Sequence, residues 1–83
     1  MTFPSNLKKY EVLYAGAPPG TGYQLAVFDS TSTRDIMINY LINQLAAYKD
    51  GDWYLVPTQD ALVNANERAK VLGGFVFDLP RAH

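Results

Sequence analysis

Four short apolar runs, three of which are followed directly by proline or glycine, are interspersed along this chain with two longer segments that begin at helix-capping residues. Strands in globular proteins are usually short, whereas an amphipathic helix needs a longer segment with a period of 3.6 residues. The order predicted from this alternation is ββαβαβ. We therefore expect an α+β fold, a small two-layer domain with a four-stranded mixed sheet and two helices. The four predicted strands are residues 9–15, 22–29, 53–56 and 75–79.

The first two runs alternate in polarity and are separated by a segment rich in proline and glycine. Residues 10, 12 and 14 share one face of the first run, and residues 23, 25 and 27 share one face of the second. Pro18, Pro19, Gly20 and Gly22 interrupt the pattern between them. This arrangement predicts an antiparallel hairpin with a stiff tip.

The first predicted helix begins at a run of five capping residues. Ser32 and Asp35 have the spacing of a capping box, in which a hydroxyl and a carboxylate each accept a free N–H of the first turn. We expect the helix to end at residues 49–51, where Gly51 can adopt a left-handed conformation. The buried stripe is predicted to be Ile38, Leu41, Ile42, Leu45 and Tyr48.

The second predicted helix is capped by Thr58, and Asp60 lies near its positive end. Its inner stripe is predicted to contain Leu62, Ala65, Ala69 and Leu72, and Gly73 and Gly74 end it. The whole chain, residues 1–83, is expected to form one domain with a loose N-terminal arm at residues 1–6.

Residues 16–24 resemble the phosphate-binding loop of AAA+ ATPases, which reads Gly-Pro-Pro-Gly-Thr-Gly-Lys-Thr. The residues that carry the chemistry differ, because Tyr23 replaces the lysine that binds phosphate and Gln24 replaces the hydroxyl that binds magnesium. Ala17 stands where the first glycine belongs, and the loop precedes another alternating run rather than a helix. We interpret the segment as a hairpin loop and expect no nucleotide cofactor.

Residues able to perform catalysis or hold a metal are few. The only histidine is His83, and there is no cysteine, so a histidine-based triad, a multi-histidine metal site and a thiolate nucleophile are all excluded. The segment 50–52, Asp-Gly-Asp, lacks the remaining ligands of a calcium loop. Asp29 and Asp78 lie near predicted strand ends and could approach one another for acid–base chemistry. We expect no enzyme, no cofactor and no metal site.

Net charge and composition limit the classes of partner. Seven basic and eight acidic residues give a net charge of −1, and the basic residues are scattered. Nucleic-acid binders concentrate positive charge, so we expect no nucleic-acid partner and no binding to anionic membranes. No apolar stretch reaches the length of a membrane span, and the lack of cysteine is typical of a reducing compartment. We expect a cytoplasmic protein.

The C-terminal third resembles the end of the small phycobilisome linker domains. The shared residues are Val56-Pro57, then Glu67-Arg68 in a helix, then the run 72–76, Leu-Gly-Gly-Phe-Val. Those domains are strongly basic and lack the long first helix predicted here, whereas this chain is slightly acidic. The resemblance covers about a third of the chain and implies a similar local strand–helix–strand arrangement.

The chain has more apolar surface than a sheet with one face in water requires. Residues 53–56 and 75–77 are wholly apolar or aromatic, whereas a strand with one wet face should alternate. A small domain can use every hydrophobic residue in its core, or one face can be an interface. We predict a non-catalytic module that docks on a larger protein as inhibitor, adaptor or assembly subunit, or that self-associates. The predicted contact residues are Tyr14, Pro18, Pro19, Thr21, Trp53 and Tyr54.

The alternative function is binding of a small ligand, or a minor enzymatic activity, in a pocket between the sheet and the helices. In that case Asp29, Asp78 or a tyrosine would supply the polar groups.

Overall fold

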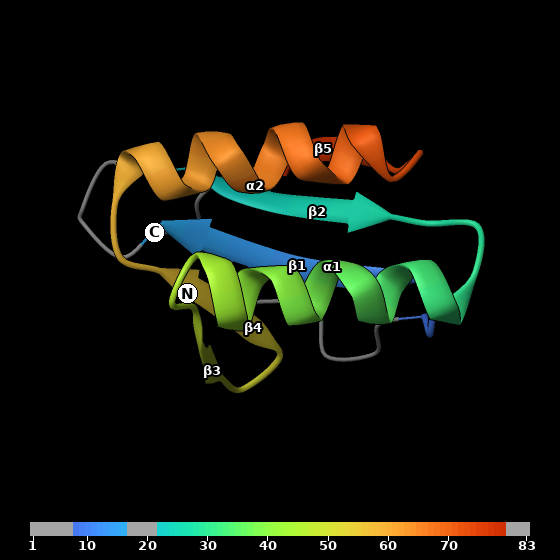
Figure 1. Ribbon diagram of the computed structural model, residues 1–83, viewed down its shortest axis with the longest axis horizontal. Helices are drawn as coiled ribbons and strands as arrows, with labels where there is room; N and C mark the ends of the chain where they lie inside the picture. The colour runs from blue at the N-terminus through green and yellow to red at the C-terminus, as the bar shows by residue number, and fades with distance from the viewer. Residues whose placement is uncertain (1–7, 17–21, 80–83) are drawn as a thin grey trace.

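The computed structural model describes residues 8–16 and 22–79 of the chain. The predicted loose arm at residues 1–6 and the hairpin tip at residues 18–21 lie outside the described residues. The elements follow one another in the order ββαββαβ (Figure 1). They are β1 (Glu11–Gly16), β2 (Tyr23–Val27), α1 (Thr31–Gln44), β3 (Tyr48–Asp50), β4 (Trp53–Val56), α2 (Gln59–Val71) and β5 (Phe75–Leu79).

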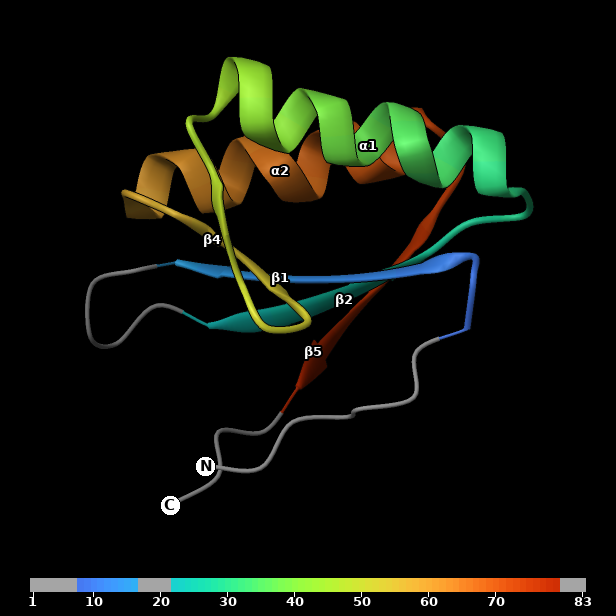
Figure 2. The same cartoon turned by 90° about the horizontal axis from the view of Figure 1, so that it is seen from below.

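The five strands form one mixed sheet in the order β3-β4-β1-β2-β5. Strands β1 and β4 are parallel, and the other three neighbouring pairs are antiparallel. Both helices lie on the same side of the sheet (Figure 2). The α+β class, the two layers and the antiparallel β1–β2 hairpin are therefore confirmed, but the prediction of four strands is wrong.

The main core lies between the sheet and the two helices. Val12 and Tyr14 of β1 point into it, as do Met37 and Leu41 of α1, and all four are fully buried. From α2, small residues at the sheet-facing positions allow the helix to approach closely; they are Ala61, Ala65 and Ala69. Because successive side chains of β1 point to opposite faces of the sheet, Val12 and Tyr14 lie on the helix side. Leu13 and Ala15 lie on the other face.

Helix α1 ends earlier than the apolar pattern predicts. It runs to Gln44, and Ala46 adopts a left-handed φ of 55°. The N–H of Ala47 then donates to the carbonyl of Leu41, which closes the helix end. Tyr48, predicted to be in the helix, instead begins β3. The end of α1 could not be predicted from the sequence, because alanine is a strong helix former and no glycine is present at the turn.

Replacing Ala46 by glycine is expected to raise the free energy of unfolding by about 0.5–1 kcal/mol. A left-handed conformation costs an L-residue about 1–2 kcal/mol, and glycine avoids most of that cost while losing more chain entropy. Urea denaturation of the variant measures the difference. The control is Asn43→Gly within α1, which should lower stability by a few tenths of a kcal/mol, because glycine has a lower helix propensity than asparagine. A loss of stability in Ala46→Gly would contradict the left-handed helix end.

Strand β3 and the turn after it replace the predicted helix end. Gly51 has a φ of 63°, so it is left-handed as predicted, but it lies in the two-residue loop between Asp50 and Trp53. Glycine in the first position of such a loop is typical of a tight antiparallel hairpin. The residues that were predicted to end the helix therefore form the hairpin that connects β3 to β4.

Capping explains where the helices begin. The hydroxyl of Ser30 accepts the N–H of Thr33 at 3.1 Å, so the cap lies two residues before the predicted Ser32. In α2, Thr58 is the cap as predicted, and its hydroxyl accepts the N–H of Ala61 at 3.1 Å. Arg34 fastens the start of α1 to the sheet, because its Nε donates to the carbonyl of Glu11 at 2.6 Å.

Two glycines lead from α2 into β5, as predicted. Gly73 is left-handed, with a φ of 82°. Gly74 lies so close to the core that a Cβ there would come within 2.5 Å of the buried Phe28 ring. The glycine pair therefore lets α2 and the edge strand β5 lie against the core at close range.

Candidate protein-interaction surface

The most exposed aromatic surface in the described chain lies on the edge strand β5. Phe75 is 71% exposed and Phe77 is 51% exposed. Both side chains lie on the sheet face away from the helices, because Phe77 pairs with Leu25 and Phe75 pairs with Val27. Val76 and Asp78 alternate with them on the helix side. The strand therefore presents two adjacent phenylalanines at the end of the sheet.

The face that carries Phe77 continues into a second apolar cluster. In register across the sheet, Phe77 lies beside Leu25, then Leu13, then Trp53. Leu13 is fully buried, and the Trp53 ring meets the Tyr23 ring edge to face, with centroids 4.7 Å apart. Phe77 thus continues an apolar row across the sheet, and Phe75 lies beside Val27 in the next row on the same face.

Other exposed apolar side chains are more scattered. Ile36 and Ile42 lie six residues apart on α1, so they point in directions about 120° apart. Val63 and Val71 are exposed on α2. Single exposed hydrophobic residues of this kind are normal on protein surfaces. Strand β5 is the element on which such residues are neighbours on one face.

Three of the predicted contact residues lie in the interior. Tyr14 is fully buried, Trp53 is 3% exposed and Tyr54 is 8% exposed. The expectation that these aromatic side chains lie on the surface is therefore wrong. Tyr14 and Tyr54 face the helices in the main core, whereas Trp53 belongs to the second cluster. Pro18, Pro19 and Thr21 lie outside the described residues, and their contact with a partner stays a prediction.

A polar row crosses the helix side of the sheet. Tyr14, Gln24 and Asp78 are successive cross-strand neighbours on β1, β2 and β5. The Tyr14 hydroxyl donates to Oδ1 of Asn66 on α2 at 2.7 Å. Burial raises the pKa of Tyr14, and the negative charge of Asp78 raises it further. Tyr14 therefore keeps its proton and ties the sheet to α2 as a hydrogen-bond donor.

The raised pKa of Tyr14 predicts a loss of stability in alkali. The unfolded chain releases this proton near pH 10, whereas the folded protein retains it, so stability is complete below pH 10 and falls above it. The decline attributable to Tyr14 approaches about 1.4 kcal/mol per pH unit. Urea denaturation at pH 8 to pH 11 would measure it. Tyr14→Phe should show a shallower decline, and an unchanged slope in that variant would contradict the assignment.

Asp29 and Asp78, which could have approached one another for acid–base chemistry, are not brought together. Asp29 follows β2 at the end where β5 begins, whereas Asp78 pairs with Gln24 near the other end of the same two strands. Five residues of extended chain separate Gln24 from Asp29, which corresponds to about 16 Å. The two carboxylates therefore do not form an acid–base pair, because the register of β5 on β2 places them at opposite ends of these strands.

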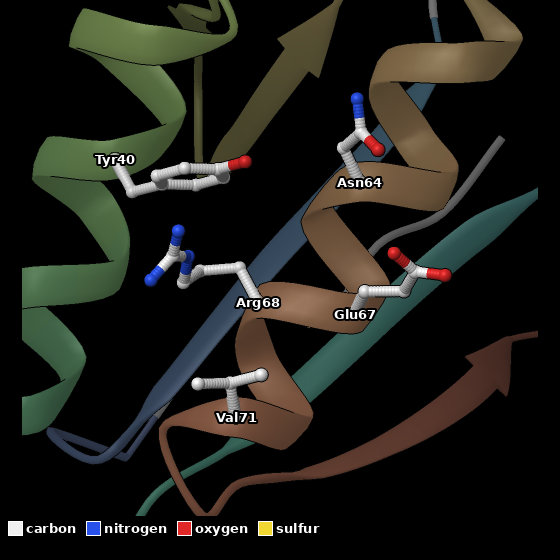
Figure 3. Close-up of a pocket in the computed structure, with 5 residues that line it drawn as sticks. All are labelled: Tyr40, Asn64, Glu67, Arg68 and Val71. Atoms are coloured by element: carbon white, nitrogen blue, oxygen red, sulfur yellow. The ribbon is translucent and has the colours of Figure 1, made fainter.

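A shallow groove lies between the two helices (Figure 3). Its volume is about 290 Å³, and Asn64, Glu67 and Val71 of α2 line it together with the Arg68–Tyr40 pair. Tyr40 of α1 and Arg68 point toward one another, with the guanidinium 4.6 Å from the ring centroid. This groove differs in place from the pocket between sheet and helices that the alternative function requires.

Within residues 8–16 and 22–79, no three His, Cys, Asp or Glu side chains come together to hold a metal ion. In the same part of the chain, neither helix has the length and apolar character needed to cross a membrane.

The sequence pattern marks residues 75–77 as an apolar run but does not identify them as a contact surface. The missing information is the strand order, since only a strand at the edge of the sheet leaves one side of its backbone unpaired. The available signal was that the last strand carries two phenylalanines two residues apart and no lysine.

Comparison with protein-family models, curated proteins and solved structures gives no match to this chain. The functional conclusion therefore rests on the geometry and chemistry of the described residues.

Proposed function

We propose that this protein is a non-catalytic protein-binding module that docks on a larger protein through the outer edge of β5. Its role would be that of an inhibitor, an adaptor or an assembly subunit. The observation that carries the proposal is the exposure of Phe75 and Phe77 on an edge strand whose outer side has no strand partner among the described residues.

Strand addition is the binding mode that this surface supports. A partner segment in extended conformation can pair its backbone with the outward-facing N–H and C=O groups of β5, which pair with no strand in the described part of the chain. Phe75 and Phe77 then offer apolar contacts on one face of the added strand, and Asp78 offers a charge on the other. Main-chain hydrogen bonds would give affinity, and the alternating side chains would give specificity.

Site-specific photo-cross-linking in cells tests this function. A photo-reactive phenylalanine analogue in place of Phe75 is expected to cross-link a discrete larger protein, and Phe77→Glu in the same chain should abolish that product. The same analogue in place of Tyr48, which is also exposed but lies on the opposite edge, is the matched control. Equal cross-linking from both positions, or none from Phe75, would contradict docking through β5.

Ligand binding remains the alternative prediction. The groove beside Tyr40 and Arg68 approaches the lower end of the volumes typical of ligand sites, which begin at about 300 Å³. The groove lies on the outer side of the helix layer, and neither Asp29 nor Asp78 lines it. The edge strand is the surface that supports a function best.

A further inference from the structure

The two edges of the sheet differ in their protection against pairing with another strand. Strand β3 has three residues, all exposed, with Lys49 at its centre. Strand β5 has five residues without lysine, arginine or proline, and its pairing with β2 is continuous and free of bulges. Short length and lysine are common means by which proteins block an edge, so β3 is better protected than β5, whose single charged residue is Asp78.

We infer that the same edge also pairs with a second copy of the chain, antiparallel through β5 about a two-fold axis at Phe77. This inference rests on the proposed function, since both use the same edge. The two sheets would join into one continuous sheet of ten strands, because each copy contributes the five strands described. Closed two-fold pairing is the commonest form of self-association.

The side chains of β5 complement themselves in this register. Phe77 lies opposite Phe77 of the partner subunit, and Phe75 lies opposite Leu79 of the partner subunit, all on one face. On the other face Val76 lies opposite Asp78 of the partner subunit. No charge is placed directly opposite a like charge, and aromatic and aliphatic pairs across strands are favourable.

The charge of Asp78 makes the stability of the dimer depend on salt concentration. In the same register the two Asp78 side chains are diagonal neighbours, about 7–8 Å apart. Their repulsion weakens the pairing at low ionic strength and is screened by salt. Removing the charge with Asp78→Asn should therefore tighten the dimer several-fold, an effect that damage to the fold would not produce.

The dimer is expected to be weak. Two paired strand edges bury less than the roughly 1,200 Å² at which stable interfaces begin, so affinity comes mainly from backbone hydrogen bonds and the phenylalanines. We expect a dissociation constant on the order of 10–100 µM. A larger protein that uses the same edge would then have to compete with self-pairing.

The chain has no cysteine, so a single introduced thiol reports the register directly. Directly opposed residues of antiparallel strands have Cα atoms about 4.5–5.5 Å apart, which is within the range of a disulfide. Phe77→Cys is therefore expected to form a disulfide-linked dimer under mild oxidation at least tenfold faster than Tyr48→Cys on the opposite edge. Asp78→Cys, whose thiols lie diagonally, should react at an intermediate rate.

Sedimentation equilibrium of the unmodified protein, from about 1 µM to about 1 mM, provides the companion measurement. The expected result is a monomer–dimer equilibrium that Phe77→Glu shifts to monomer and Tyr48→Glu leaves unchanged. A monomer throughout this range, or equal oxidation rates for Phe77→Cys and Tyr48→Cys, would overturn the inference. If the protein is monomeric but the Phe75 position still cross-links a different protein in cells, the proposed function stands and only self-pairing fails.

Discussion

Replacing Trp53 by alanine is expected to lower the free energy of unfolding by about 3–5 kcal/mol. Trp53 is 3% exposed and lies in the second apolar cluster with Leu13 and Ala15, on the sheet face that no described helix covers. Its removal deletes a large buried side chain and its contact with the Tyr23 ring. A chain of this size has a total stability of about 4–12 kcal/mol, so the loss is a large fraction.

Phe77→Ala is the control on the same sheet face. Because Phe77 is half-exposed, its truncation should lower stability by only about 1 kcal/mol. Urea denaturation compares the two variants, and Trp53→Phe, with a smaller expected loss, supplies a folded variant if Trp53→Ala does not fold. Similar losses in Trp53→Ala and Phe77→Ala would contradict the separation between a buried cluster and an exposed edge.

Leu41→Ala is expected to lower the free energy of unfolding by about 2–5 kcal/mol. Leu41 is fully buried in the main core, and its carbonyl also accepts the N–H of Ala47 that closes the end of α1. The neighbouring Ile42 is exposed, so Ile42→Ala should lower stability by less than about 1 kcal/mol. Thermal or urea denaturation of the two variants tests the orientation of α1. Equal losses would mean that α1 faces the sheet with a different side.

Local signals in the sequence were sufficient to predict most of the helices and strands. Strands β4 and β5 have the predicted bounds, and Thr58 and Gly73 delimit α2 as predicted. These signals are strong because a cap hydroxyl and a left-handed glycine each satisfy a definite need of the backbone. Strand β3 was missed because a left-handed alanine, which sequence does not mark, ends α1 before Tyr48.

The candidate surface could be predicted only in part. The apolar excess in residues 53–56 and 75–77 was visible, but an apolar strand in sequence can be central or at an edge. Trp53 lies on β4, which has neighbours on both sides, and is buried, whereas Phe77 lies on β5 at the end of the sheet and is exposed. Strand order depends on contacts between distant segments, so periodicity along the chain cannot supply it.

Residue-resolved hydrogen exchange of β5 tests the central claim most directly, which is that the outer edge of this strand is open for pairing. In dilute protein, we expect the β5 amides that face β2 to be protected and the alternate, outward-facing amides to exchange freely. The outward-facing amides should become protected at high protein concentration, and this protection should be absent in Phe77→Glu. Outward-facing amides already protected in dilute protein, or equally exposed at every concentration and with every partner, would contradict the account.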